Sequence, residues 1–172
     1  MAKEKFIKVL PQYIFDEEMH RRGINDENVE VIDDEAFISI INTKECLKHY
    51  LEDEGTKHYF SENHSNVINL DFDDLENDFV WHGHLFKAMD EKQAEGLFGF
   101  IERNIGKSFT IHCRAGFSRS QAVGAFIKDN YKDVYTDENT DSSTINRDRL
   151  NHGVMKLLMR KLYEKRGLFT EQ

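Results

Sequence analysis

The segment from His112 to Ser120, HCRAGFSRS, combines a cysteine, an arginine and a glycine within one short stretch. A β-prone run, Ser108 to Ile111, precedes it, and apolar residues at helical spacing follow from Ala122 to Ile127. The segment therefore predicts a loop that ends at a helix N-terminus. Unpaired N–H groups and the helix dipole favour an anion there, and the same field stabilises a thiolate at Cys113. We interpret the segment as a phosphate-binding loop with a nucleophilic cysteine.

The pattern Cys-x5-Arg-Ser, preceded by His112 and with glycine at the third intervening position, resembles the signature of the cysteine-dependent protein tyrosine phosphatases. Within that superfamily the chain is most similar to small dual-specificity phosphatases, over about residues 36–131. The resemblance implies that Cys113 attacks phosphorus to give a phosphocysteine and that the planar fork of Arg119 holds two phosphate oxygens. It also implies that Ser120 donates a hydrogen bond to the sulfur and that His112 orients the loop. The phosphate cradle would consist of backbone amides of Arg114, Ala115, Gly116, Phe117, Ser118 and Arg119.

This chemistry also needs a general acid, which the family supplies from an aspartate after an upstream strand. Residues 66–74 alternate apolar and polar, and Asp73 and Asp74 follow the strand they predict. The carboxyl ends of neighbouring parallel strands converge, so either aspartate could approach Cys113. The spacing in dual-specificity members favours Asp74, with Asp73 as the alternative, whereas Asp71 should point to the other face. The chain departs from larger tyrosine phosphatases because it contains no Trp-Pro-Asp tripeptide.

The resulting hypothesis is a phosphoric monoester hydrolase acting on phosphorylated proteins, either as a tyrosine or as a dual-specificity phosphatase. Two alternatives stay open. The same chemistry could act on RNA 5′-phosphates or phosphoinositides, or the loop could bind phosphoproteins without turnover. A net charge of −9 argues against broad binding to nucleic acid or to anionic membranes, which normally require a basic surface.

Composition indicates one intracellular domain. The chain has 172 residues, 39% of them hydrophobic, and no Pro, Gly or Ser-rich linker divides it, so we expect a single domain over residues 1–172. There is no long apolar run and no signal-peptide pattern, which favours a cytoplasmic protein that does not span a membrane. Two cysteines suit a reducing compartment better than a disulfide scaffold. The oligomeric state is left open.

The second cysteine and a pair of histidines invite other interpretations. Cys46 lies on the apolar face of a predicted helix over residues 43–54, where a packing role is favoured over a resolving thiol that would trap oxidised Cys113. His82 and His84 lack a third residue at ligand spacing nearby, and alternating histidines after a tryptophan are typical of a loop. We therefore expect no metal and no cofactor.

Around these residues, the pattern predicts an α/β fold with a largely parallel central sheet flanked by helices, as the phosphatase resemblance also implies. Asp90 and Gln93 resemble a capping pair that begins a helix ending near Gly106, and this helix should cross over between neighbouring strands. Residues 135–146 are polar and predict an exposed loop, and an apolar stripe from Leu150 to Leu162 predicts a final helix. Strands are expected at residues 6–10, 36–41, 67–72 and 109–113.

Overall fold

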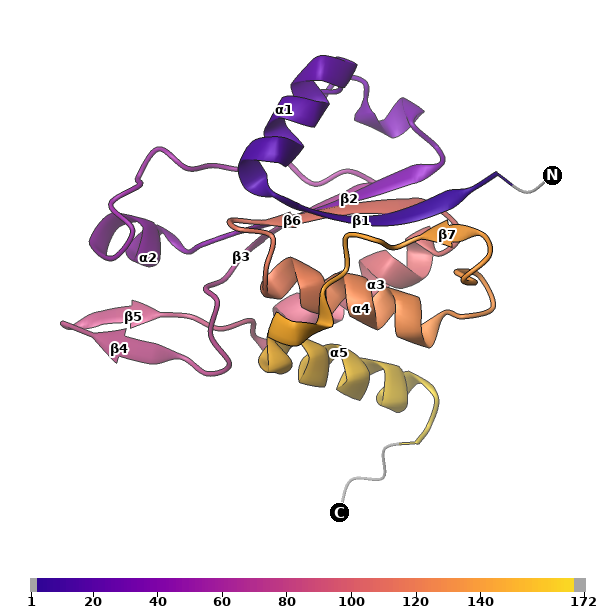
Figure 1. Ribbon diagram of the computed structural model, residues 1–172. Helices are drawn as coiled ribbons and strands as arrows, with labels where there is room; N and C mark the ends of the chain where they lie inside the picture. Colours follow the sequence, from indigo (N-terminus) through magenta and orange to yellow (C-terminus); the bar gives the residue numbers. More distant parts are fainter. Residues whose placement is uncertain (1–2, 169–172) are drawn as a thin grey trace.

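The structure, a computed structural model, describes residues 3–168, so the outermost residues of the predicted 1–172 domain lie outside the described part. Strands and helices alternate along the chain (Figure 1). In order they are β1 (Lys5–Pro11), α1 (Gln12–Arg22), β2 (Glu35–Ile41), α2 (Lys44–His49), β3 (Val67–Asp71), β4 (Phe79–Trp81), β5 (His84–Phe86), α3 (Glu91–Asn104), β6 (Ser108–Cys113), α4 (Arg119–Asn130), β7 (Thr140–Asp141) and α5 (His152–Lys165). Short 3-10 turns lie at Val29–Val31 and Arg147–Arg149.

Five strands form one parallel sheet in the order β3-β2-β6-β1-β7. Every residue of β2 and of β6 is buried, because both strands lie inside the sheet and helices cover both of its faces. The predicted α/β class with a parallel sheet flanked by helices is therefore confirmed. The four strands expected from the sequence are present, with ends that differ by one residue.

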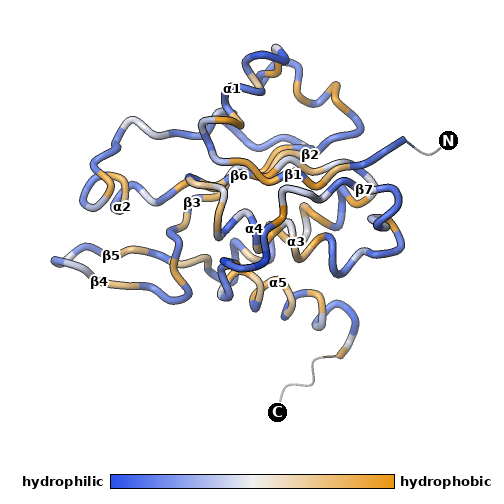
Figure 2. The backbone as a smooth tube through the Cα atoms, viewed as in Figure 1, coloured by the Kyte–Doolittle hydropathy of each residue, from blue (hydrophilic) through white to orange (hydrophobic). Residues whose placement is uncertain are grey.

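Helices pack on the two faces of the sheet in unequal numbers (Figure 1). On one face α1 contributes Phe15 and Met19 to a smaller apolar cluster. On the other face α3, α4 and α5 pack together and bury the larger core. Figure 2 shows the apolar residues concentrated in the strands and on the inward sides of these helices. Within residues 3–168, no helix is long and apolar enough to cross a membrane.

Two expectations about helices need correction. Helix α3 begins at the predicted Asp90–Gln93 capping box, but the strands it joins are not neighbours, because β2 lies between β3 and β6. Sequence order alone does not show which strand inserts between two others. The helix expected over residues 43–54 ends at His49, where α2 stops after six residues. Thr43 caps its first turn by accepting a hydrogen bond from the Cys46 amide.

The prediction of an exposed loop over residues 135–146 is wrong in part. Tyr135 is 1% exposed and packs in the main core, where its hydroxyl donates to the Lys107 carbonyl. Thr140–Asp141 forms β7, which pairs in parallel with the start of β1. The rest of the segment is largely exposed. The sequence did not predict this strand because its residues are polar. A polar strand is tolerated here because β7 lies at the edge of the sheet and pairs only with β1.

The β4–β5 hairpin stands apart from the main sheet and lies beside α2 (Figure 1). His82 and Gly83 form its two-residue turn, with φ of 47° and 78°. Two consecutive positive φ values are typical of a type I′ turn, whose twist matches that of a hairpin. The predicted loop at the two histidines is therefore a strand pair, in which His82 is at the tip and His84 begins β5.

Candidate active site

The segment singled out from the sequence forms a tight loop between β6 and α4. Cys113 is the last residue of β6, and Arg119 is the first of α4, so the loop ends at a helix N-terminus as expected. Gly116 has φ +74° and lies against the end of β1, where an added Cβ would be 2.7 Å from the Pro11 nitrogen. Only glycine fits this conformation and this close approach without strain.

We expect Gly116→Ala to lower the free energy of unfolding by about 2–4 kcal/mol, because it combines a strained backbone with a clash against backbone atoms. Equilibrium denaturant unfolding measures this loss. Gly96→Ala is the matched control. Among the described residues nothing lies within 4 Å of its added Cβ, and Gly96 is inside α3, so alanine should raise the free energy of unfolding by about 0.5–1 kcal/mol. Equal effects at the two glycines would contradict this view of the loop.

The proposed nucleophilic sulfur lies beside a hydroxyl group from the start of the following helix. Cys113 Sγ lies 2.9 Å from Ser120 Oγ, on the first turn of α4. Both residues are buried, but Cys113 borders a cavity. A hydroxyl at this distance can donate a hydrogen bond to a thiolate, and such a bond stabilises sulfur as a leaving group. The structure therefore brings together two of the residues that the resemblance assigned to catalysis.

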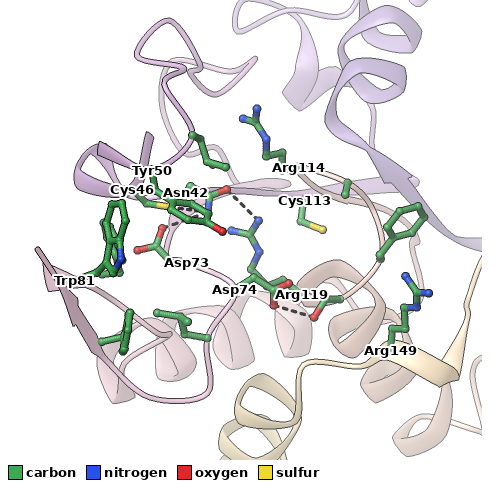
Figure 3. Close-up of a pocket in the computed structure, with 17 residues that line it drawn as sticks. Asn42, Cys46, Tyr50, Asp73, Asp74, Trp81, Cys113, Arg114, Arg119 and Arg149 are labelled. Carbon is green, nitrogen blue, oxygen red and sulfur yellow. Dashed lines mark hydrogen bonds between the residues drawn. The ribbon is translucent and has the colours of Figure 1, made fainter. Parts of the chain in front are cut away.

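Arg119 is held by the strand end that carries the aspartates. Its Nη1 donates to the Phe72 carbonyl at 2.6 Å, and its Nη2 donates to Asn42 Oδ1 at 3.1 Å. Arg119 is 4% exposed and borders the same cavity as Cys113 (Figure 3). Its Nε is buried and has no hydrogen-bond partner within residues 3–168. A buried N–H without an acceptor is costly, and an anion in the cavity would satisfy it.

His112 is fixed at the inner end of a chain of hydrogen bonds. Its Nε2 lies 2.7 Å from Ser39 Oγ, which lies 2.7 Å from His58 Nδ1, and His58 Nε2 contacts the Asp71 carboxylate. Complete burial lowers the pKa of His112 to about 3, so its ring is neutral at pH 7. Its Nδ1 faces the Cys113 carbonyl at 3.4 Å. A neutral ring that donates to this carbonyl must accept from Ser39, which fixes the ring beneath the loop.

The buried neutral ring of His112 makes stability depend on pH. Below pH 6.5, the ordinary pKa of histidine, His112 binds a proton in the unfolded chain. In the folded chain its ring stays unprotonated down to about pH 3. Stability from this residue is therefore complete above pH 6.5 and decreases as the pH falls through that window. We expect the thermal midpoint of His112→Gln to change less steeply than that of the wild type between pH 6.5 and 4. Parallel midpoint curves would show that His112 is not the titrating group.

The structure distinguishes the two candidate aspartates from each other and from Asp71. Asp73 is 2% exposed, and its carboxylate accepts from the Thr43 amide and hydroxyl, the Lys87 amide and the Asn42 side chain. Asp74 is exposed and borders the cavity (Figure 3). Its carboxylate accepts from Ser118 Oγ and Asn151 Nδ2, both at 2.8 Å. Asp71 does not border this cavity.

A cavity of about 860 Å³ opens above the loop. Cys113, Arg119 and both candidate aspartates border it, together with Arg149 and Arg114 (Figure 3). The Arg114 guanidinium is paired with the Asp53 carboxylate at 2.8 Å. The rest of its wall is largely apolar and includes Tyr50, Leu51, Leu75, Phe79, Trp81 and Phe86. Phe117, from the tip of the loop, is exposed at its edge. The cavity can hold an anion bonded to a planar apolar group.

Several residues that position the site had no motif to reveal them. Asn42 links Arg119 to Asp73, and Asn151 caps α5 while it donates to Asp74. Gln121 donates to the Gly116 carbonyl and to the Thr144 carbonyl, so it links the 113–119 loop to the segment that was expected to be an exposed loop. Asparagine at a helix N-cap was the one available signal, because Asn151 precedes the apolar stripe of α5.

Cys46 also borders the cavity, with its thiol 3.5 Å from Asn42 Nδ2. Burial and the nearby Asp73 carboxylate raise its pKa to about 11, so the thiol is protonated at neutral pH. A protonated thiol is a poor nucleophile, which favours the expected packing role over a resolving one.

The hairpin histidine His84 lies beside His49 of α2, a proximity that the sequence spacing did not indicate.

Comparison with known proteins gives no family. No protein-family model matches the chain, and no curated protein matches it significantly.

Proposed function

We propose that the protein is a cysteine-dependent phosphoric monoester hydrolase with a dual-specificity phosphatase-like fold, acting on phosphorylated proteins through a phosphocysteine on Cys113. One observation carries the proposal. The buried Nε of Arg119 has no hydrogen-bond partner within residues 3–168, and Arg119, at the N-terminus of α4, borders the same cavity as Cys113. Arginine N–H groups and helix N-termini are preferred partners of phosphate, and a thiol among them is placed to attack it.

The reaction would proceed in two displacements. Cys113 Sγ forms a bond to phosphorus as the P–O bond to the leaving group breaks, and Asp74 gives its proton to the departing oxygen. Arg119 and the loop amides stabilise the charge on the equatorial oxygens. Water then attacks phosphorus and gives a proton back to Asp74, while the P–S bond breaks and Ser120 Oγ–H stabilises the released thiolate.

The cavity wall favours an aromatic phosphoester. Tyr50, Trp81 and Phe86 form one aromatic group, in which the Trp81 ring centroid lies 5.7 Å from that of Tyr50 and 6.2 Å from that of Phe86. A phosphotyrosine side chain places a flat apolar ring directly behind its phosphate, which such a wall can contact. We therefore propose phosphotyrosine in proteins as the main substrate, in a reducing compartment that keeps Cys113 a thiol.

Hydrolysis of para-nitrophenyl phosphate in chelator and fresh reductant tests the activity. The expected result is turnover without added metal, and rapid acid quenching followed by mass spectrometry should find phosphate on the peptide that contains Cys113. Phosphotyrosine peptides should be better substrates than matched phosphoserine peptides. Tight binding of phosphopeptides without turnover would instead favour a recognition module, and hydrolysis confined to RNA 5′ ends or phosphoinositides would change the substrate class.

If Asp74 is the general acid, substitutions of Asp74 and of its neighbour Asp73 should have different effects. We expect Asp74→Asn to reduce kcat by about 10²–10⁴-fold for poor leaving groups and much less for para-nitrophenolate, because a good leaving group needs little protonation. Steady-state rates across a series of aryl phosphates measure this dependence. Asp73→Asn should chiefly lower thermal stability, since that carboxylate is buried among four donors. A stronger leaving-group dependence in Asp73→Asn would move the acid by one residue.

A further inference from the structure

A cluster of three metal-ligating side chains lies outside the proposed catalytic site, between α2 and the β4–β5 hairpin. Glu45 and His49 are four residues apart on α2 and therefore share one helix face. His84 reaches them from the start of β5. One ligand atom from each residue lies within 4.8 Å of the other two. The cluster thus combines two elements that are about 35 residues apart in the chain.

The distances from Glu45 to the two histidines are close to those between ligands of one ion. Glu45 Oε2 lies 3.1 Å from His84 Nδ1 and 3.5 Å from His49 Nε2, and the two imidazoles stack with centroids 3.5 Å apart. Tetrahedral zinc with bonds of about 2.0–2.1 Å holds its ligand atoms roughly 3.3–3.4 Å apart. The separation of 3.5 Å is long for a hydrogen bond. The Glu45 oxygen is therefore already close to the spacing that such a site needs from each imidazole nitrogen, and the two nitrogens lie within 4.8 Å of each other.

We propose that Glu45, His49 and His84 bind a divalent transition-metal ion of the zinc type. Two imidazole nitrogens and one carboxylate oxygen suit Zn²⁺, Co²⁺ or Ni²⁺, whereas Mg²⁺ and Ca²⁺ prefer oxygen ligands alone. All three residues are partly or largely exposed, so water can complete the coordination. The metal site is inferred from these three side chains alone and does not depend on the proposed phosphatase activity.

Bound metal would join the hairpin to α2 beside the cavity. Tyr50 directly follows His49, and Trp81 is paired with His84 across the hairpin. The Trp81 ring packs edge-on against Tyr50, with an interplanar angle of 87°. An ion held by His49 and His84 therefore fixes the two aromatic residues that form one wall of the cavity. Trp81 is the single tryptophan of the chain, so its fluorescence reports on this wall.

Titration of the full chain with Zn²⁺ and Co²⁺ tests the proposal. The experiment uses the Cys113→Ser background, so that the loop thiol cannot act as a ligand. We expect one ion per chain by calorimetry, the visible absorption of four-coordinate Co²⁺, and a change in Trp81 fluorescence that saturates at the same ratio. Mg²⁺ should produce none of these signals.

Substitution of the ligands identifies the site. His49→Gln and His84→Gln should each weaken Zn²⁺ binding by at least about 100-fold, because loss of a ligand costs more than the 10–100-fold loss of an outer hydrogen bond. His82→Gln is the matched control, since His82 lies at the hairpin tip and outside the cluster, and its affinity should equal that of the parent. Binding that survives His84→Gln, or no stoichiometric binding to the folded parent chain, would overturn the proposal.

Discussion

Cys113→Ser is expected to reduce phosphatase turnover by about 10⁴-fold or more, because a serine hydroxyl at this position lacks the nucleophilicity of the thiolate. The fold should be retained, since the substitution replaces one buried atom beside Ser120 with a smaller one. Binding of inorganic phosphate should also persist, because Arg119 and the loop amides are unchanged. Steady-state hydrolysis and equilibrium phosphate binding, measured on the same preparation, separate these two effects.

Cys46→Ser is the matched control for this substitution. Cys46 borders the same cavity, but its thiol contacts Asn42, and its raised pKa keeps it protonated. We expect this variant to keep most of the wild-type turnover. If Cys113→Ser remained as active as Cys46→Ser, Cys113 would not be the nucleophile, and the proposed reaction would be wrong.

Arg119→Lys is expected to lower kcat by about 10³-fold and to weaken phosphate binding, although it preserves the positive charge. A lysine ammonium cannot donate to the Phe72 carbonyl and to Asn42 while it also presents a planar pair of N–H groups to an anion. The loss therefore measures the geometry of the fork separately from its charge. Single-turnover rates and phosphate affinity should both fall.

Arg149→Lys is the corresponding control. Arg149 also borders the cavity, but it is exposed and comes from the short turn before α5. The same change of residue type there should alter catalysis only slightly, because an exposed cation at the rim acts mainly through its charge. Equal losses at the two positions would contradict a special role for the Arg119 fork.

Much of the framework could be predicted because it depends on local patterns. The buried strands are short apolar runs, the Asp90–Gln93 box marks the start of α3, and the residues of the 113–119 loop adjoin one another in the sequence. The strand order could not be predicted in the same way. It depends on which strand inserts between β3 and β6, and β2 does so through contacts that no local pattern encodes.

The supporting residues of the candidate site could not be predicted either, because their contacts join distant parts of the chain. Asn42 bonds to Arg119 across 77 positions of the chain, and Asn151 bonds to Asp74 across another 77. An asparagine outside a motif has no distinguishing spacing. The choice between Asp73 and Asp74 is similar, because burial and hydrogen bonding, which differ sharply between these neighbours, become visible only when α2, β3 and α5 are assembled.

The position of β1 inside the sheet affects how the chain must be made. Ile7 pairs with Phe109, and Lys5 pairs with Thr140, so β1 is synthesised about 100 residues before β6 and about 135 residues before β7. At translation rates of about 5–20 residues per second, this apolar strand waits roughly 5–20 s with both edges open. Unpaired strand edges attract other chains. The 113–119 loop rests against the end of β1, so it can be completed only after this early strand has been joined by β6.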